Sequence, residues 1–450
     1  MDKNLIGSKN ILIKSGKIID PLKCEEYFSD IYIKDGLVAG IGKEAKTKKK
    51  DLTVIDAPGC LVCPGSEDMH VHLRDPGDED EETIESGAVA ALKGGITSVA
   101  CMPNTKPVID SEHLIKYILE KSKEIDFKVF PVASMTKGIE GKKICEFGML
   151  AGSGAVAFSD DGRCVTDSEL MYEIMKYSNQ FGLPLILHEE DYNFSNYGLI
   201  NEGYYSSMLG LGGISSLGED VIVARDIILA KKAKAKIHIT HVSTKGSVEM
   251  IRKAKEDSVN VTCDVTPHHL FFNDSCLKTF NTNFKVNPPI RSEGDRKAII
   301  EGIREGVIDA VASDHAPHLD IEKNTAFEEA SFGTIGLETL FSAGFTRLCR
   351  EEKISLPKFI SLITSSPAKI LGIDAGKIET GKTADIAVIN AEAAGEVKVD
   401  GFASKSKNSA FIGQKLWGKV AYTISNGKLV YINNIYKKGC NFESNFNVRR

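Results

Sequence analysis

The 450-residue sequence predicts an α/β protein: a distorted (β/α)8 TIM-like barrel with a small β-sandwich domain formed by both termini. From about residue 61 to residue 372, apolar strand-like runs alternate with helical patterns, which indicates a parallel sheet covered by helices. Both ends of the chain are instead rich in short β-type runs. We therefore expect residues 1–60 and 373–450 to form the β domain and residues 61–372 to form the barrel.

The first β-type runs lie at residues 10–14, 16–19, 30–33 and 37–41. Asp35-Gly36 joins the last two, and this dipeptide favours a tight hairpin turn between strands. Runs of the same style return at residues 384–389 and 420–431. Two β-rich ends around an α/β middle predict one domain built from both ends.

The middle of the chain repeats a strand and helix pattern. Strand-like runs lie at 97–102, 128–132, 183–187, 236–240, 259–263 and 307–312. Helical patterns lie at 83–93, 113–123, 168–180, 219–232 and 247–254. This many alternations favours a closed barrel over an open sheet.

Composition narrows the function. Hydrophobic residues at 42% and charged residues at 26% are ordinary for a soluble globular protein. A net charge of −6 without a basic stripe gives no footprint for nucleic acid, so we expect a small-molecule substrate. The N-terminus lacks a signal pattern and no apolar run could span a bilayer, which predicts a cytoplasmic protein without a membrane partner.

Four clusters of His and Asp stand out, and each follows a strand-like run: His70-Val71-His72, His188, His241, and the segment 314–318. The C-terminal strand ends form the active face of a (β/α)8 barrel. His70 and His72 are two residues apart, so strand alternation places both imidazoles on one face. Imidazole with carboxylate is a ligand mix suited to zinc, which indicates a metal-dependent hydrolase.

Five segments together resemble class I bacterial dihydroorotases, in the amidohydrolase superfamily: 64–77, 102–105, 158–162, 287–291 and 313–318. The likeness covers essentially the whole chain, including the split β domain. It implies the reversible, zinc-dependent cyclisation of N-carbamoyl-L-aspartate to L-dihydroorotate, a step of de novo pyrimidine (UMP) biosynthesis.

The resemblance also implies two Zn²⁺ ions per subunit joined by a hydroxide. The implied ligands are His70, His72 and Asp314 for the more buried ion, His188 and His241 for the second, and Asp161 as the bridge. Hydantoinases use a modified lysine as the bridge, and no lysine is available in segment 155–162. Asp160 is the alternative bridge, and an Asp-Asp-Gly can also be a plain turn.

The remaining site residues are expected from the same resemblance. Asp314 would carry the proton between the hydroxide and the ring nitrogen. Arg74, a planar bidentate donor, would bind the substrate α-carboxylate, although a surface ion pair is the alternative. The other implied substrate contacts are Asn104 and His318 beside Arg74, and Asn287 with the backbone around Phe332 and Gly333 at the ring.

Rival functions remain open. One is a related cyclic amidohydrolase, such as an allantoinase or a hydantoinase (dihydropyrimidinase). Another is an inactive, metal-free homologue that scaffolds aspartate carbamoyltransferase. A homodimer and an association with aspartate carbamoyltransferase are partners that the resemblance allows. We also expect residues 319–331 to close over the substrate as a lid, because they join the Asp314 motif to Phe332-Gly333.

Overall fold

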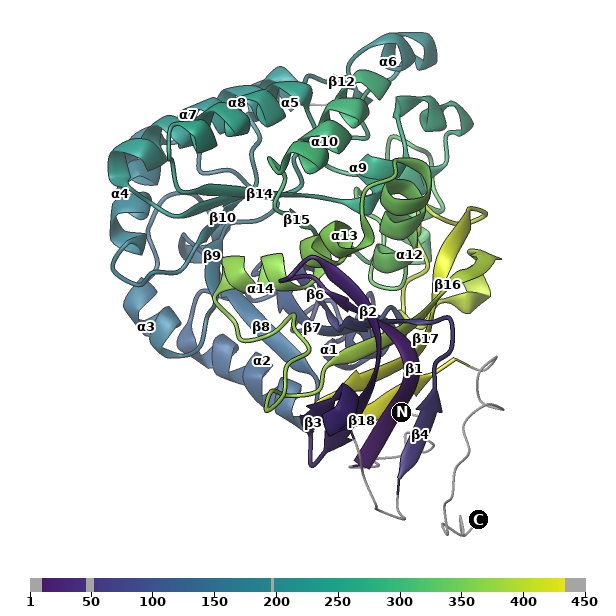
Figure 1. Ribbon diagram of the computed structural model, residues 1–450. Coiled ribbons are helices and arrows are strands. Elements are labelled where there is room, and N and C mark those ends of the chain that lie inside the picture. The colour runs from purple at the N-terminus through teal and green to yellow at the C-terminus, as the bar shows by residue number, and fades with distance from the viewer. Residues whose placement is uncertain (1–9, 46–51, 196–197, 434–450) are drawn as a thin grey trace.

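A computed structural model describes residues 10–45, 52–195 and 198–433. Two large sheets dominate it: a parallel sheet ringed by helices, and a mixed sheet built from both ends of the described chain (Figure 1). The expected TIM-like barrel with a β domain from both termini is therefore confirmed.

The parallel sheet has the order β15-β14-β13-β10-β9-β8-β7-β6. Its strands are β6 (Ser66–Val71), β7 (Ile96–Cys101), β8 (Lys128–Ala133), β9 (Ala157–Ser159), β10 (Leu185–Leu187), β13 (Ile237–Ile239), β14 (Val261–Val265) and β15 (Ala310–Val311). A short parallel bridge between Val71 and His315 joins its two ends, and His72 N donates to His315 O over 2.9 Å. The barrel is thus nearly closed beside the Asp314 motif.

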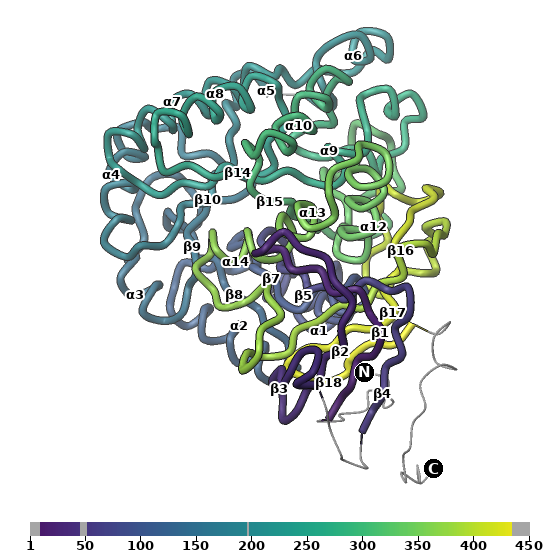
Figure 2. The backbone as a smooth tube through the Cα atoms, in the orientation of Figure 1, coloured from purple at the N-terminus to yellow at the C-terminus, as the bar shows by residue number. Residues whose placement is uncertain are grey.

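Helices surround this barrel (Figure 2). They are α1 (Ile84–Lys93), α2 (Glu112–Glu124), α3 (Phe147–Gly152), α4 (Ser168–Ser178), α7 (Leu217–Ala233), α8 (Lys245–Glu256), α10 (Glu293–Glu305), α13 (Leu356–Ile363) and α14 (Ser365–Leu371). The start of α1 follows from local chemistry, because Thr83 and Ser86 cap each other's backbone amides. None of the described helices has the length and apolar character needed to cross a membrane.

Shorter elements fill the connections. They are α5 (Tyr192–Ser195), β11 (Ile200–Asn201), α6 (Tyr204–Leu209), β12 (Gly213–Ile214), α9 (Pro267–Phe271), α11 (Asp320–Lys323) and α12 (Leu340–Gly344). The long connection after His188 therefore has secondary structure of its own.

The mixed sheet has the order β18-β17-β16-β5-β1-β2-β3, with β4 paired to β1. Its strands are β1 (Asn10–Asp20), β2 (Glu25–Lys34), β3 (Leu37–Ile41), β4 (Thr53–Asp56), β5 (Leu61–Pro64), β16 (Ile386–Glu396), β17 (Lys415–Ser425) and β18 (Lys428–Ile432). The Asp35-Gly36 hairpin is confirmed, since β2 and β3 pair antiparallel. β5 joins the two terminal halves, so the sheet takes in residues 61–64; the domain limits themselves stay a prediction.

Candidate metal centre

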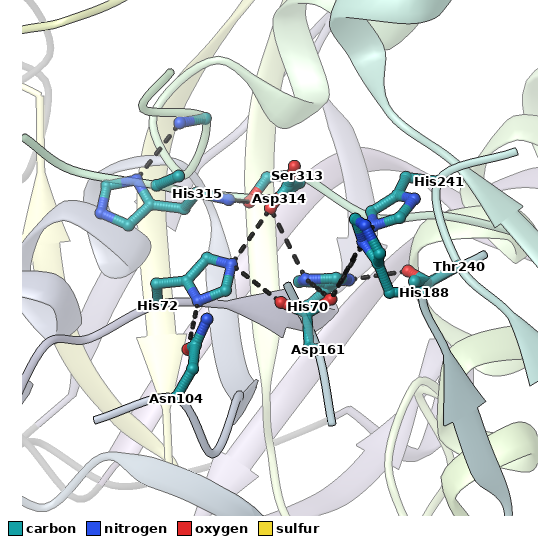
Figure 3. Close-up of polar contacts among 12 residues, drawn as sticks. His70, His72, Asn104, Asp161, His188, Thr240, His241, Ser313, Asp314 and His315 are labelled. Atoms are coloured by element: carbon teal, nitrogen blue, oxygen red, sulfur yellow. Dashed lines mark hydrogen bonds and ion pairs between the residues drawn. The ribbon is translucent and has the colours of Figure 1, made fainter. Parts of the chain in front are cut away.

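The six predicted metal ligands lie together at the C-terminal end of the barrel (Figure 3). His70 lies in β6 and His72 follows it, while the others follow later strands: Asp161 after β9, His188 after β10, His241 after β13 and Asp314 after β15. The four imidazoles and Asp161 are at most 7% exposed. Successive parallel strands therefore bring residues from distant parts of the sequence to one buried point.

Two carboxylates, those of Asp314 and Asp161, face His70 and His72. The Asp314 Oδ1 lies 3.3 Å from His72 Nε2 and 3.5 Å from His70 Nε2. The Asp161 Oδ1 lies 3.3 Å from His70 Nε2, and its Oδ2 lies 3.5 Å from His72 Nε2. Each carboxylate thus faces both imidazoles across a gap that one cation could share.

The second histidine pair lies on the other side of Asp161. His188 Nδ1 and His241 Nε2 are 3.1 Å apart. The Asp161 Oδ1 lies 4.0 Å from that His188 atom and 3.8 Å from that His241 atom. Asp161 is therefore the residue that faces all four imidazoles, as a bridging ligand must.

Protein acceptors fix which nitrogen each histidine of β6 presents. Thr240 Oγ1 donates to Asp264 Oδ2 at 2.9 Å, so it accepts the hydrogen of His70 Nδ1 at 2.7 Å. Asn104 Oδ1 accepts from His72 Nδ1 at 2.8 Å. With their Nδ1 atoms protonated, His70 and His72 both present the Nε2 lone pair to the carboxylates.

In His188 the roles of the two ring nitrogens are reversed. Its Nε2 lies 3.1 Å from the Glu190 Oε2, and a carboxylate there accepts the hydrogen. The bare nitrogen of His188 is then Nδ1, which faces His241. Three of the four imidazoles thus have their outer nitrogen occupied by a protein acceptor, the arrangement typical of metal-ligating histidines.

The charges of the site also fit a cation. Burial lowers the pKa of His70, but the nearby Asp161 and Asp314 outweigh it and raise the pKa to about 10. Burial raises the pKa of Asp161, but His70 and the other imidazoles hold it well below its ordinary range. Two buried carboxylates therefore require compensating positive charge, which protons or a metal ion can supply.

Two buried atoms at the centre of the cluster have no hydrogen-bond partner among the described residues: His70 Nε2 and Asp161 Oδ1. Burying such atoms without a partner is costly, and a bound cation would remove that cost. Imidazole nitrogens and carboxylate oxygens are also the donors that zinc accepts. The residues present thus fit a metal ion.

Backbone strain is found at the same place. His241 and Asp314 adopt left-handed φ angles of 37° and 48°. Such conformations cost about 1–3 kcal/mol each and persist where surrounding contacts enforce them. At His241 the enforcing contact is visible, because its backbone amide donates to Asp264 Oδ1 at 2.8 Å.

Asp160, the alternative bridge, has a different environment. Its Oδ1 accepts from the backbone amides of Met135 at 2.8 Å and Thr136 at 3.0 Å, and its Oδ2 accepts from the Thr136 hydroxyl. Burial raises the pKa of Asp160 to about 6, against the effect of these donors. Both oxygens are occupied outside the histidine cluster, so Asp160 shapes the loop after β9.

Arg74 is already paired. Its Nε lies 2.8 Å from the Glu81 Oε2, and its Nε and Nη2 also contact Pro317 O at 3.3 and 3.2 Å. The structure thus brings Arg74 to the Asp314 motif with an acidic partner on the Nε side of the guanidinium.

The other predicted substrate residues lie in two places. His318 Nε2 donates to Phe332 O at 2.8 Å, and its Nδ1 lies 3.7 Å from Glu81 Oε1, so His318 is next to Arg74's partner. Asn287 Nδ2 donates to Glu190 Oε2 at 3.1 Å, beside His188. The backbone amide of Gly333 donates to Lys285 O at 2.9 Å, so it is engaged within the protein.

Sequence reasoning missed the layer behind the ligands. No role was predicted for His238 from the sequence, but its Nε2 lies 2.8 Å from Asp264 Oδ2, the oxygen that also accepts from Thr240. A chain of contacts thus runs from His238 through Asp264 and Thr240 to His70. The available signal was strand alternation: His238 and Thr240 share a face of one strand, and Asp264 lies on the next.

Comparisons with known proteins agree with this geometry. A family model described as dihydro-orotase-like matches residues 59–247, and one described as amidohydrolase family matches residues 297–431. A dihydroorotase of Acetivibrio thermocellus is 45% identical over 421 residues, covering 93% of this chain and 98% of that protein. A dihydroorotase of Geobacter metallireducens is 47% identical over 423 residues, covering 94% and 99%.

Solved structures with the same fold are more distant in sequence. An L-hydantoinase (dihydropyrimidinase) from Arthrobacter aurescens superposes with a TM-score of 0.83 at 24% identity, covering 94% of this chain and 96% of that one. A dihydropyrimidinase from Brevibacillus agri gives 0.81 at 22% identity, covering 94% and 95%. At this identity the likeness concerns the fold.

Proposed function

The chain belongs to the dihydroorotase family of amidohydrolases, and from that premise we propose that it interconverts N-carbamoyl-L-aspartate and L-dihydroorotate. The observation that carries the proposal is the identity of 45–47% to dihydroorotases over nearly the full length of both chains. The buried His and Asp cluster supports it, because opening or closing a cyclic amide needs an activated water and a polarised carbonyl.

We propose two zinc ions per subunit. His70, His72 and Asp314 would hold one ion, His188 and His241 the other, and Asp161 both. Zinc supplies Lewis acidity: it polarises the substrate carbonyl and lowers the pKa of water to about 7. His70 Nε2 and Asp161 Oδ1 support this assignment, because they lie 3.3 Å apart and neither makes a hydrogen bond among the described residues.

Asp314 is the proton carrier in this proposal. Its carboxylate stands beside the histidine pair of β6, and its side chain is 13% exposed, more than any of the four imidazoles. One oxygen faces His70 and His72, so the carboxylate can accept a proton from water and deliver it to the ring nitrogen of the amide. In the cyclisation direction Asp314 would carry the proton the other way, from the nitrogen to the oxygen that leaves as water.

Arg74 would bind the substrate carboxylate, since a planar guanidinium makes paired hydrogen bonds with it. Glu81 pairs with Nε, and Pro317 O accepts from Nε and Nη2, so Nη1 and the second hydrogen of Nη2 would be left for the carboxylate of the substrate. Asn104 and His318 would complete this end of the pocket. Asn287 and the backbone at Phe332 and Gly333 would contact the ring.

Two alternatives are weaker. A hydantoinase or allantoinase would share the fold, but a hydantoinase bridges its metals with a lysine, and here Asp161 faces all four histidines. An inactive scaffold for aspartate carbamoyltransferase would have lost metal ligands, yet the six expected residues lie together.

The test is ring opening of L-dihydroorotate by the purified protein, with hydantoin and allantoin as parallel substrates and zinc measured on the same sample. Turnover of dihydroorotate alone, with about two zinc ions per chain, is the expected result. Turnover of hydantoin instead, or dihydroorotate turnover without metal, would overturn the proposal.

Sedimentation of the protein with and without aspartate carbamoyltransferase would test two further proposals, the homodimer and the association with that enzyme.

A further inference from the structure

Two buried lysines contact the backbone of the segment that ends at Phe332 and Gly333: Lys285 from outside it, and Lys323 from α11 within it. Lys285 is 2% exposed and Lys323 is 5% exposed. Lysine is almost never buried this deeply without partners, because an ammonium group loses its hydration. Burial lowers the pKa of both, that of Lys323 to about 7, and backbone carbonyls accept from both side chains.

Lys323 donates to carbonyls on both sides of Phe332. Its Nζ lies 2.7 Å from Ser331 O and 2.9 Å from Gly333 O, with Lys285 O further away at 3.5 Å. The one side-chain nitrogen of Lys323 therefore holds the residues before and after Phe332. Gly333 is held from its other side too, since its amide donates to Lys285 O at 2.9 Å.

Lys285 holds the same segment at a second point. Its Nζ donates to Phe327 O at 2.8 Å and Glu328 O at 3.0 Å, and lies 4.7 Å from the centre of the Phe332 ring. A cation at this distance from an aromatic ring is attracted to it. Phe332 is thus fixed through its ring as well as through its neighbours.

The fixed backbone in turn sets His318. The Phe332 carbonyl can only accept, so the hydrogen at this 2.8 Å contact belongs to His318 Nε2. A side chain at Gly333 would meet this ring as well, because a Cβ there would lie 2.9 Å from His318 Nε2. The positions of Phe332 O and of the His318 ring are therefore coupled.

We propose that Lys285 and Lys323 are positioning residues: they hold the Phe332-Gly333 backbone and, through the Phe332 carbonyl, orient His318 for the substrate. The inference rests on the proposed function, because it takes His318 and this backbone as substrate contacts. It also changes the expectation for residues 319–331, whose α11 end is anchored by Lys323 beneath the surface.

The test is kinetic analysis of Lys323→Met, which keeps an unbranched apolar chain and removes the ammonium donors. We expect the KM for dihydroorotate to rise about tenfold or more, with kcat within about threefold and zinc content unchanged, because Ser331 O loses the Lys323 donor and Gly333 O keeps only that of Asn408 Nδ2. Lys323→Arg should recover part of the KM. Lys236→Met is the matched control, because Lys236 also donates to a carbonyl, Ile370 O at 2.6 Å, but precedes β13 at the opposite end of the barrel.

Hydrogen exchange provides a readout that is independent of activity. In Lys323→Met the amides of residues 327–333 should exchange faster than in the wild type, while Lys236→Met leaves them unchanged. Unchanged KM and unchanged exchange in Lys323→Met would overturn the inference, as would loss of zinc with equal falls in kcat and KM. If Lys323→Met does not fold, the same kinetic and exchange measurements are made on Lys285→Met. A wild type without dihydroorotate turnover would overturn the proposed function and the substrate role of His318, while the exchange result would still decide whether Lys323 holds the Phe332-Gly333 backbone.

Discussion

The Nδ1 of His70 and the Oγ1 of Thr240 lie 2.7 Å apart, and this contact decides which nitrogen His70 offers to a metal. Thr240 uses its own hydrogen toward Asp264, so its oxygen can only accept from His70. The Nε2 lone pair is thereby left facing Asp161 and Asp314. A hydroxyl without any predicted role thus sets the chemistry of a predicted ligand.

Thr240→Val should weaken zinc binding about 10- to 100-fold, the usual cost of removing a hydrogen-bond partner behind a ligating histidine. Valine keeps the shape of threonine but cannot accept from His70. The measurement is zinc affinity by competition with a chelator. Thr423→Val is the control, because the Thr423 hydroxyl is also buried but donates to Leu92 O outside the site. Equal affinities for wild type and Thr240→Val would show that His70 needs no such partner.

Asp161→Ala should reduce the zinc bound per chain far more than Asp160→Ala. The reason is their surroundings: Asp161 faces the four histidines, and Asp160 accepts from the amides of Met135 and Thr136. Asp160→Ala should instead lower the free energy of unfolding by about 1–3 kcal/mol, because two amides lose their acceptor. Zinc content by atomic emission and unfolding by denaturant separate the two effects. The reverse pattern would make Asp160 the bridging residue.

Asp314→Asn should lower kcat about 10²- to 10⁴-fold for both ring opening and ring closure, because asparagine cannot carry the proton. Both directions must be measured, since one carboxylate serves both. Zinc is measured on the same sample, because Asp314 is also a predicted ligand. Asp309→Asn is a suitable control: Asp309 precedes β15, at the other end of the strand, where it pairs with Lys255. A zinc-loaded Asp314→Asn enzyme with wild-type kcat would remove Asp314 as the carrier.

Much of the fold and the pairing of His70 with His72 could be predicted from local rules, whereas the ligand roles of Asp161, His188, His241 and Asp314 were expected from the resemblance to dihydroorotases. Strand alternation alone places His70 and His72 on one face, and a barrel brings strand ends together. The layer behind the ligands depends on register between strands, which sequence does not display. Ile239 pairs with Cys263, and this register is what places Asp264 beside Thr240 and His241.

Side-chain contacts made by the loops could not be predicted from the sequence either. Arg74 was expected to bind a substrate carboxylate, and its sequence position gave no sign that Glu81 pairs with it. The carboxylates of Glu81 and Glu322 both lie within 3.7 Å of His318 Nδ1, although Glu81 comes from the loop before α1 and Glu322 from α11. Such contacts depend on loop conformation, which residue order alone does not determine.

Arg74→Gln should raise the KM for dihydroorotate about 10- to 100-fold with a smaller change in kcat, because the lost contact is a charge-assisted, bidentate one. Arg74→Lys should recover only part of the lost affinity, since an ammonium group keeps the charge but not the planar fork.

Arg304→Gln is the control for Arg74→Gln, because Arg304 lies on α10 and pairs with Glu301 at 3.0 Å. Glu81→Gln adds a second comparison: if Glu81 only holds the Nε side, its KM effect should be smaller than that of Arg74→Gln. An Arg74→Gln effect confined to kcat would instead place Arg74 in the chemical step and leave the carboxylate of the substrate to another residue.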